Sequence, residues 1–298
     1  MNTTMIALVG LLGLAFASQA TRVGGVERKT CKAPDGVSIV YSAAGAGETA
    51  LVFVHGGMAD RTFYDAQLDV FAPRYRVVSV DLGGHGESGS NRKKWGMREL
   101  AADVKAVADA EGLKRMVLFG NSLGGPVTVE AALLMPGRVL GVVGVDTFQD
   151  VGHPETPEYA QAAKKEFTER AEAFRRDYPA ALKAMMKYLF HPDTDPALVA
   201  EAEKRMLKTP PAVAADVIAS LAGYDVNASA RRLTVPLRAI NGDLYPTDIK
   251  AARKVKPDFD AIVMKHIGHY PMLERPAEFN RHVATVVEDL LRGARPQR

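Results

Sequence analysis

Apolar runs that end in glycine alternate with helical stretches over the first half of this 298-residue chain. The runs "ALVFVHGG", "YRVVSVDLGGHG" and "RMVLFG" are short and rich in β-branched residues, which is typical of buried parallel strands that lead into loops. Strands that alternate with helices pack as a sheet between layers of helix. The sequence therefore predicts an α/β fold with a mostly parallel, doubly wound sheet of about eight strands.

The alternation stops at about residue 150 and resumes at about residue 231. Between these points only helical signals occur, and aromatic residues fall on one stripe of a charged helix. We interpret 150–230 as a helical cap inserted into the fold, so that 21–149 and 231–298 form the two parts of the core. The stripe comprises Tyr159, Phe167, Phe174 and Tyr178.

A separate apolar run near the N-terminus, Met5 to Ala17, is too short to span a bilayer comfortably. Small residues follow it at Ser18 and Ala20, the two positions that a signal peptidase reads. This order predicts a signal peptide at 1–20 and a secreted or periplasmic protein with no membrane contact after cleavage. The preceding "MNTT" lacks Lys and Arg, so an uncleaved membrane anchor is the alternative.

The charge of the chain is nearly balanced. Lys and Arg number 38, Asp and Glu number 35, and the two signs are spread along the sequence. Nucleic-acid binding requires a concentrated basic surface. The composition therefore predicts no nucleic-acid partner.

Ser122 lies in the pattern Gly-x-Ser-x-Gly, between a predicted strand and a predicted helix. A serine hydroxyl is a weak nucleophile until a base can reach it, and a tight strand-to-helix turn lifts its oxygen clear of the sheet. Small residues at Gly120 and Gly124 make such a turn sterically possible. The pattern predicts a nucleophile, although a glycine turn with an idle serine fits the same letters.

Three further motifs each follow a predicted strand. They are "VFVHGGM", "VDLGGHGES" and the pair Gly268-His269, which precedes the last helix. Together with "GNSLGG", in this order, they resemble the α/β-hydrolase superfamily over residues 34–291. The resemblance implies that Ser122 is the nucleophile and His269 the general base.

The resemblance also implies an oxyanion hole. Its donors are the backbone N–H groups of Gly57 and Leu123, and Met58 is a substitute donor if the "HGGM" loop is set one residue later. His266 is the competitor of His269 for the role of base and ranks behind it. The Gly-His pair before a helix is the arrangement that the family shows.

The acid of the triad is the least defined member. The family usually places it in the loop after the strand that follows the cap, which here is "INGDLYPTDI". That loop offers Asp243 and Asp248, while Asp146 ends an earlier strand at a position that some members use. Asp243 follows Gly242 directly, which departs from the usual spacing. The order of preference is Asp243, then Asp146, then Asp248.

No catalytic or metal-binding role is predicted for the remaining histidines. His55 and His85 lie in glycine-rich loops and are expected to brace the backbone through hydrogen bonds. Neither these two nor the other histidines group at metal-ligand spacing in the sequence, so no metal and no other cofactor is expected. Those other histidines are His153, His191 and His282.

The function that the resemblance implies is hydrolysis of a carboxylic ester or related acyl bond by a Ser-His-Asp triad. The same triad also serves hydrolysis of carbon-carbon bonds in diketones and cofactor-free peroxidation, which remain alternatives. A non-catalytic ligand-binding protein with the hydrolase fold is the alternative from another class. Apolar and aromatic residues of the cap favour a small, apolar acyl substrate, and the expected contacts with it are Phe148, Met185 and Tyr245.

Overall fold

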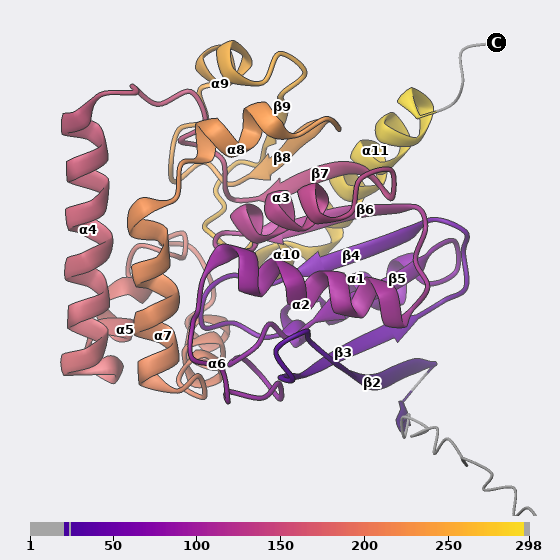
Figure 1. Cartoon of the computed structure of the whole chain (residues 1–298), viewed down its shortest axis with the longest axis horizontal. Helices are drawn as coiled ribbons and strands as arrows, with labels where there is room; N and C mark the ends of the chain where they lie inside the picture. The colour runs from indigo at the N-terminus through magenta and orange to yellow at the C-terminus, as the bar shows by residue number, and fades with distance from the viewer. Residues whose placement is uncertain (1–20, 24, 295–298) are drawn as a thin grey trace, which may run out of the picture.

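The protein, described by a computed structural model over residues 21–23 and 25–294, folds around a sheet of nine strands (Figure 1). The strand order is β1-β2-β3-β5-β4-β6-β7-β8-β9. Strands β4 to β9 pair in parallel, while β1, β2 and β3 are antiparallel to their neighbours. The predicted α/β sheet is confirmed, and the three-residue β1 extends the eight strands at one edge.

The strands run over these residues: β1 Thr21–Val23, β2 Val26–Lys32, β3 Ser38–Ala44, β4 Ala50–Val54, β5 Arg76–Val80, β6 Met116–Asn121, β7 Val139–Val145, β8 Leu237–Asn241 and β9 Asp260–Val263. The helices of the core are η1 Arg61–Tyr64, α1 Asp65–Phe71, α2 Met97–Ala110, α3 Gly124–Leu134, α8 Val226–Arg232, α9 Ile249–Val255, α10 Pro271–Glu274 and α11 Pro276–Gly293. The remaining helices are α4 Pro157–Arg176, α5 Tyr178–Met186, α6 Pro196–Met206, α7 Pro211–Ala219 and η2 Ser220–Gly223.

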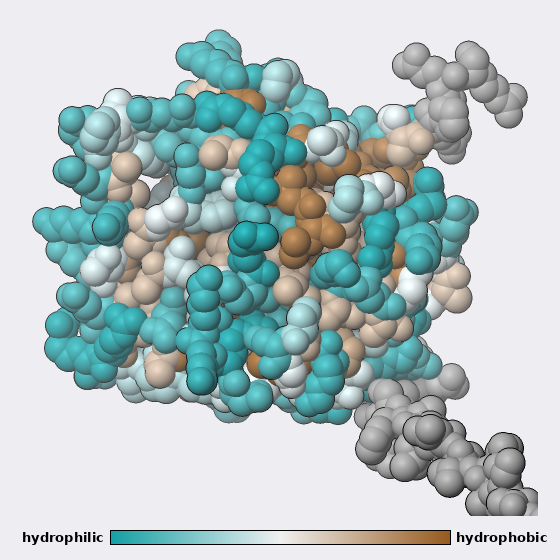
Figure 2. Space-filling model, in the orientation of Figure 1, coloured by the Kyte–Doolittle hydropathy of each residue, from teal (hydrophilic) through white to brown (hydrophobic). Residues whose placement is uncertain are grey.

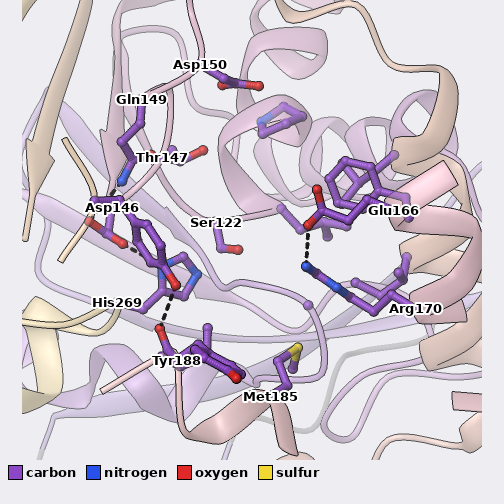
Figure 3. Close-up of a pocket in the computed structure, with 18 of the residues that line it drawn as sticks. Ser122, Asp146, Thr147, Gln149, Asp150, Glu166, Arg170, Met185, Tyr188 and His269 are labelled. Carbon is purple, nitrogen blue, oxygen red and sulfur yellow. Dashed lines mark hydrogen bonds and ion pairs between the residues drawn. The ribbon is translucent and has the colours of Figure 1, made fainter. Parts of the chain in front are cut away.

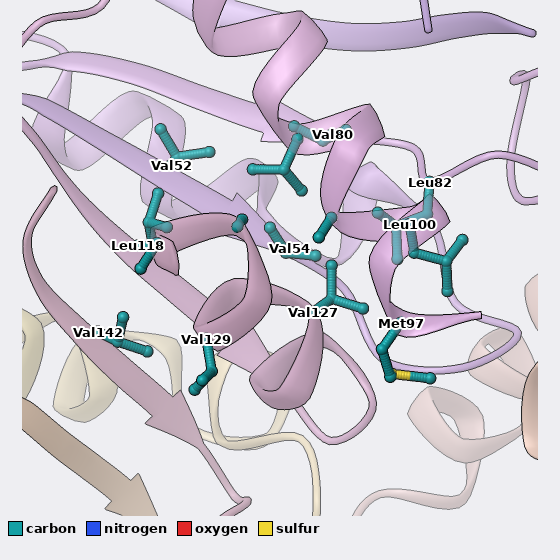
Figure 4. Close-up of a cluster of buried hydrophobic side chains, with 14 of the residues drawn as sticks. Val52, Val54, Val80, Leu82, Met97, Leu100, Leu118, Val127, Val129 and Val142 are labelled. Carbon is teal, nitrogen blue, oxygen red and sulfur yellow. The ribbon is translucent and has the colours of Figure 1, made fainter. Parts of the chain in front are cut away.

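Helices cover both faces of the sheet because each central strand is apolar on both sides. Side chains alternate along a strand, so Val52 and Val54 of β4 face one way while Leu51 and Phe53 face the other. The Val52 face packs against α2 and α3, whose buried side chains appear beside the strands in Figure 4. The Leu51 face packs against α1 and α11. These two apolar layers fix the sheet and thereby the loops at its carboxyl edge.

Five helical elements, α4 to η2, fall within the segment that the sequence assigns to the cap. In Figure 1 helices α4 to α7 gather beyond one end of the strands. The predicted aromatic stripe is divided between two helices, because α4 ends at Arg176 and Asp177 caps α5 by accepting a hydrogen bond from Ala180 N at 3.1 Å. Helix α8, at the end of the predicted segment, packs against α3 of the core.

The outer surface is largely hydrophilic. Figure 2 shows hydrophilic side chains over most of one face, with hydrophobic ones gathered in the region of α3 and α11. None of the helices in the described part of the chain is long and apolar enough to cross a membrane. The predicted signal peptide at 1–20 lies outside the described residues.

Candidate active site

Ser122 lies on the turn between β6 and α3, and its backbone is in the left-handed region with φ at 51°. A side chain at Gly120 would come within 2.1 Å of the Gly124 carbonyl oxygen, and one at Gly124 within 2.5 Å of the Val54 carbonyl oxygen. Only glycine fits at both positions, which confirms the predicted steric reason for the pattern. A left-handed backbone costs free energy for a non-glycine residue. The surrounding structure therefore holds Ser122 in a strained conformation.

His269 and Asp146 form a direct contact. His269 Nδ1 lies 2.5 Å from Asp146 Oδ2, and the second carboxylate oxygen of Asp146 accepts a hydrogen bond from Gly242 N at 2.9 Å. Asp146 follows β7, which neighbours β6, the strand that carries Ser122. Figure 3 shows Ser122 and His269 next to each other in the same pocket, with Asp146 on the far side of the imidazole. The three side chains are thus arranged in the order serine, histidine, aspartate.

The preference for Asp243 as the partner of His269 is corrected by this contact. Asp243 Oδ1 instead accepts a hydrogen bond from Ile267 N at 3.3 Å, so its carboxylate braces the loop that precedes His269. Asp248 caps α9 by accepting a hydrogen bond from Ala251 N at 2.9 Å. Each of these two carboxylates has a local structural partner, which leaves Asp146 at the imidazole.

The backbone N–H groups predicted for the oxyanion hole lie beside Ser122. A side chain added at Gly57 would lie 4.0 Å from the Leu123 Cβ atom, so the two residues are neighbours, and both line the pocket with Met58. In the described part of the chain, the N–H groups of Gly57, Met58 and Leu123 donate to no acceptor. Leu123 also stands at the N-terminus of α3, where the helix dipole favours negative charge. The geometry suits stabilisation of an oxyanion.

The two histidines of the glycine-rich loops brace the backbone, as predicted. His55 Nε2 accepts a hydrogen bond from Leu82 N at 3.1 Å, and its Nδ1 lies 2.7 Å from the Gly56 carbonyl oxygen, to which it donates. The loop after β4 is thereby tied to the loop after β5. Burial lowers the pKa of His55 to about 4 and that of His85 to about 3, so both are neutral in the folded protein at pH 7.

The pocket has a volume of about 760 Å³ and is lined by residues of the loops at the carboxyl edge of the sheet and by residues of the cap. This volume is in the range of roughly 300–1,000 Å³ that small-molecule sites occupy. On the cap side, Arg170 Nη2 donates to Glu166 Oε1 at 2.6 Å, opposite Ser122 in Figure 3. Apolar cap residues complete that wall: Phe167, Ala181, Met185, Leu189 and Ile218.

All three residues expected to contact substrate line this pocket. Phe148 is buried beside Gly125 and Gly144, so it shapes the floor. Met185 belongs to the cap. Tyr245 is 44% exposed and donates a hydrogen bond from its hydroxyl group to the Tyr188 carbonyl oxygen at 3.1 Å.

Two supporting side chains were missed in the sequence. Asn121 Nδ2 donates to the carbonyl oxygens of Val145, at 2.8 Å, and of His269, at 2.9 Å, so one amide links the serine turn to the histidine loop. Gln149 Nε2 donates to Asp146 Oδ1 at 3.0 Å. Asn121 was visible in the motif "GNSLGG", but its partners lie in other segments that only the fold brings near.

The cap makes direct contact with the loops that carry His269 and Met58. The N–H of His269 donates to the Leu189 carbonyl oxygen at 2.6 Å. The Thr209 hydroxyl group donates to the Met58 carbonyl oxygen at 3.0 Å and is buried. The cap therefore supports the histidine loop and the loop of the predicted oxyanion hole.

The prediction that the other histidines stay apart is wrong for one of them. The fold brings His191 beside His266, with 5.5 Å between the ring centroids. This pair was missed because the two residues come from the cap and the core, which are far apart in sequence. His266 points to this cluster and not to Asp146, whose contact is with His269.

Residues 51–282 match the alpha/beta hydrolase family, which is most of the chain. The match agrees with the sheet order, the serine turn and the histidine loop described above. The protein belongs to this family and is a hydrolase.

Relatives and solved structures support the same assignment. The chain is 25% identical to a pimeloyl-[acyl-carrier protein] methyl ester esterase of Aliivibrio salmonicida, over 81% of this chain and 93% of that protein. A thermophilic esterase from Thermogutta terrifontis superposes with a TM-score of 0.77 at 25% identity, over 88% of this chain and 98% of that one. A dihydrolipoyllysine-residue acetyltransferase component of an acetoin cleaving system from Cupriavidus necator is 33% identical over 36% of this chain, and the match spans only 29% of that protein.

Proposed function

We propose that the protein is a serine esterase that cleaves a carboxylic ester through an acyl-enzyme formed on Ser122. The observation that carries the proposal is the contact of His269 with Asp146 in the pocket that Ser122 lines. Two relatives that match over most of their length are named as esterases, which supports ester cleavage.

In the proposed reaction His269 Nε2 takes the proton of Ser122 as Oγ attacks the ester carbonyl carbon. The carbonyl oxygen becomes an oxyanion, which the N–H groups of Gly57 and Leu123 stabilise, and one such donor contributes about 3 kcal/mol. The protonated imidazole then gives its proton to the departing alcohol as the carbon-oxygen bond breaks. Water repeats the sequence and releases the acid, while Asp146 holds the imidazole and stabilises its charged form.

The substrate that fits best is a neutral ester with an apolar acyl group. Most of the cap wall of the pocket is apolar, and Glu166 and Arg170 on that wall form an ion pair. The third acidic or basic side chain of the wall is Asp150, whose pKa is raised by burial. A buried apolar wall gains free energy from apolar contact and loses it when it must desolvate a charge. We expect short and medium p-nitrophenyl esters to be turned over.

The test combines labelling with turnover. A fluorophosphonate probe should attach to one residue, and peptide mass spectrometry should locate it at Ser122. Ser122→Ala should abolish both labelling and hydrolysis of p-nitrophenyl butyrate, while Ser220→Ala, which changes a cap serine outside the pocket, should leave both intact. Labelling of Ser122→Ala at the rate of the wild type, or faster cleavage of a ring-fission diketone than of any ester, would exclude the proposal.

We further propose that the mature enzyme is secreted. The support is the apolar run from Met5 to Ala17 and the small residues at Ser18 and Ala20. Protein expressed with its complete N-terminus in a bacterial host should appear outside the cytoplasm with Thr21 as its first residue, as mass spectrometry of the intact chain would show. An intact N-terminus in the membrane fraction would indicate an anchor.

A further inference from the structure

Three side chains that can bind a metal meet outside the active site, where the cap touches the core. His191 and Asp193 belong to the cap segment after α5, and His266 belongs to the loop between β9 and His269. Their ligand atoms all lie within 4.8 Å of one another. In the described part of the chain this is the one group of three or more His, Cys, Asp or Glu side chains with such spacing.

The geometry of the group suits a transition-metal ion. Zinc binds imidazole nitrogen and carboxylate oxygen at about 2.0–2.2 Å, so its ligand atoms lie about 3.3–3.5 Å apart in a tetrahedral site. Here the His191 Nδ1 and Asp193 Oδ2 atoms are 3.5 Å apart. The third ligand is His266, whose ring is nearly perpendicular to that of His191, at 87°, and whose ligand atom lies within 4.8 Å of the other two.

The chemistry of the His191 ring is also suitable. Its Nδ1 atom accepts a hydrogen bond from the backbone N–H of Asp193 at 3.2 Å, so this nitrogen carries no proton, and an ion that binds it takes the place of that hydrogen bond. Asp193 and His266 are exposed and His191 is half-buried, which leaves a path for the ion and room for water as a fourth ligand. Two imidazoles with one carboxylate favour zinc, cobalt or nickel over calcium or magnesium, which prefer oxygen ligands.

The site lies where the cap is tied to the loop of His269. The Gly268 position is packed so closely that an added Cβ atom would lie 2.6 Å from both the Leu189 carbonyl oxygen and the backbone nitrogen of His191. Glu274 Oε2 accepts hydrogen bonds from Gly268 N at 3.1 Å and from the Thr194 hydroxyl group at 2.6 Å. An ion held by both segments would add a bond across this junction.

We propose that His191, Asp193 and His266 form a binding site for a divalent transition-metal ion such as Zn²⁺, which fastens the cap to the histidine loop. The ion is not a reactant, because it binds outside the pocket that contains Ser122. Its effect is on stability: an ion that binds the folded chain alone raises the temperature of unfolding.

The test uses tag-free protein that has been treated with a chelator and desalted. Titration calorimetry with ZnCl₂ should show one saturable site per chain, and Zn²⁺ should raise the unfolding temperature. Cobalt should give the visible absorption bands of a histidine-ligated ion. Hydrogen exchange should slow in residues 187–194 when Zn²⁺ is bound.

Variants distinguish binding at this site from binding at other histidines of the chain. His191→Ala and His266→Asn should lose saturable binding and the rise in unfolding temperature; Asn is chosen because His266 has φ at 54°, which Asn tolerates. His282→Ala is the matched control, since His282 lies near Glu278 on α11 at 3.8 Å, away from the cluster, and should bind like the wild type. Circular dichroism and metal-free unfolding establish that each variant is folded.

Two results would overturn the proposal. One is undiminished binding by folded His191→Ala or His266→Asn protein. The other is loss of binding in His269→Ala with binding retained in His191→Ala, which would place the ion at the catalytic histidine.

Discussion

His269 and Asp146 lie 2.5 Å apart although one belongs to the loop before α10 and the other to the loop after β7. The carboxylate is held on its other oxygen by Gly242 N and by Gln149. Because the amide of an asparagine cannot hold the imidazole in the same tautomer, we predict that Asp146→Asn lowers kcat by a factor of about 10³–10⁴. Steady-state hydrolysis of a p-nitrophenyl ester measures the effect.

Asp243→Asn is the control for this prediction. Asp243 contacts Ile267 N and not the imidazole, so its variant should retain kcat within a few-fold of the wild type. A large loss of kcat in Asp243→Asn together with an active Asp146→Asn would reverse the assignment.

The left-handed backbone of Ser122 predicts an unusual order of stabilities. Glycine accepts this conformation without steric cost, whereas alanine does not, so Ser122→Gly should be more stable than Ser122→Ala by about 1 kcal/mol. At Ser220, with φ at −68°, the order should reverse, because glycine there only adds freedom to the unfolded chain. Urea unfolding of the four variants gives both differences, and equal stability of the two Ser122 variants would show that the turn carries no strain.

The hydrogen bond from the Thr209 hydroxyl group to the Met58 carbonyl oxygen predicts that a change in the cap affects turnover. Thr209→Val keeps the shape but removes the donor, which should lower the free energy of unfolding by about 1–2 kcal/mol. It should also lower kcat, because the loop of the oxyanion donors loses a support.

Ser220→Ala is the comparison for Thr209→Val. It removes a hydroxyl bond that Ser220 makes to Val217 inside the cap, at 2.6 Å. We expect Ser220→Ala to lower the free energy of unfolding and to leave kcat unchanged. If both variants lowered kcat equally, the loss would be a general effect of a weakened cap.

The buried His85 predicts a loss of stability in mild acid. Burial lowers its pKa from 6.5 to about 3, so between these values the unfolded chain binds a proton that the folded chain does not. Stability therefore falls as the pH falls through this window. Asn retains a donor for the Gly83 carbonyl oxygen, which His85 Nδ1 contacts at 3.0 Å, but does not titrate. Between pH 7 and pH 5 the wild type should lose about 2 kcal/mol relative to His85→Asn.

Chemical unfolding at the two pH values checks this expectation. The comparison with His85→Asn removes the contributions of the other buried groups, which both proteins share. If the difference in the free energy of unfolding between the two proteins stayed constant from pH 7 to pH 5, the prediction for His85 would be wrong.

The sequence was sufficient for the fold and for the serine turn because these depend on local patterns. Apolar runs that end in glycine specify buried strands, and the clash of any side chain at Gly120 with Gly124 is a property of one short turn. The parallel pairing of β4 to β9 agrees with the alternation of strands and helices in the sequence. The triad roles of Ser122 and His269 remain predictions that the proposed variants test.

The acid could not be assigned from sequence because three aspartates end up near the carboxyl edge of the sheet. The choice among them depends on which loop faces the imidazole, and in the fold this is the loop after β7, where Asp146 contacts His269. The pairing of His191 with His266 was hidden for a related reason. It exists only because the cap returns to the core at this point, and no spacing within one segment indicates it.

The hydrogen bond from the His269 N–H to the Leu189 carbonyl oxygen has a consequence for engineering. A chimaera that received the cap of another hydrolase would keep Ser122, His269 and Asp146 in its sequence. It would still lose turnover unless the foreign cap offered a carbonyl oxygen at the same place. Exchanging the cap to alter substrate specificity would therefore also alter the catalytic rate of this enzyme. A transplanted cap has to be chosen for the position of its backbone carbonyl groups as well as for its pocket-lining side chains.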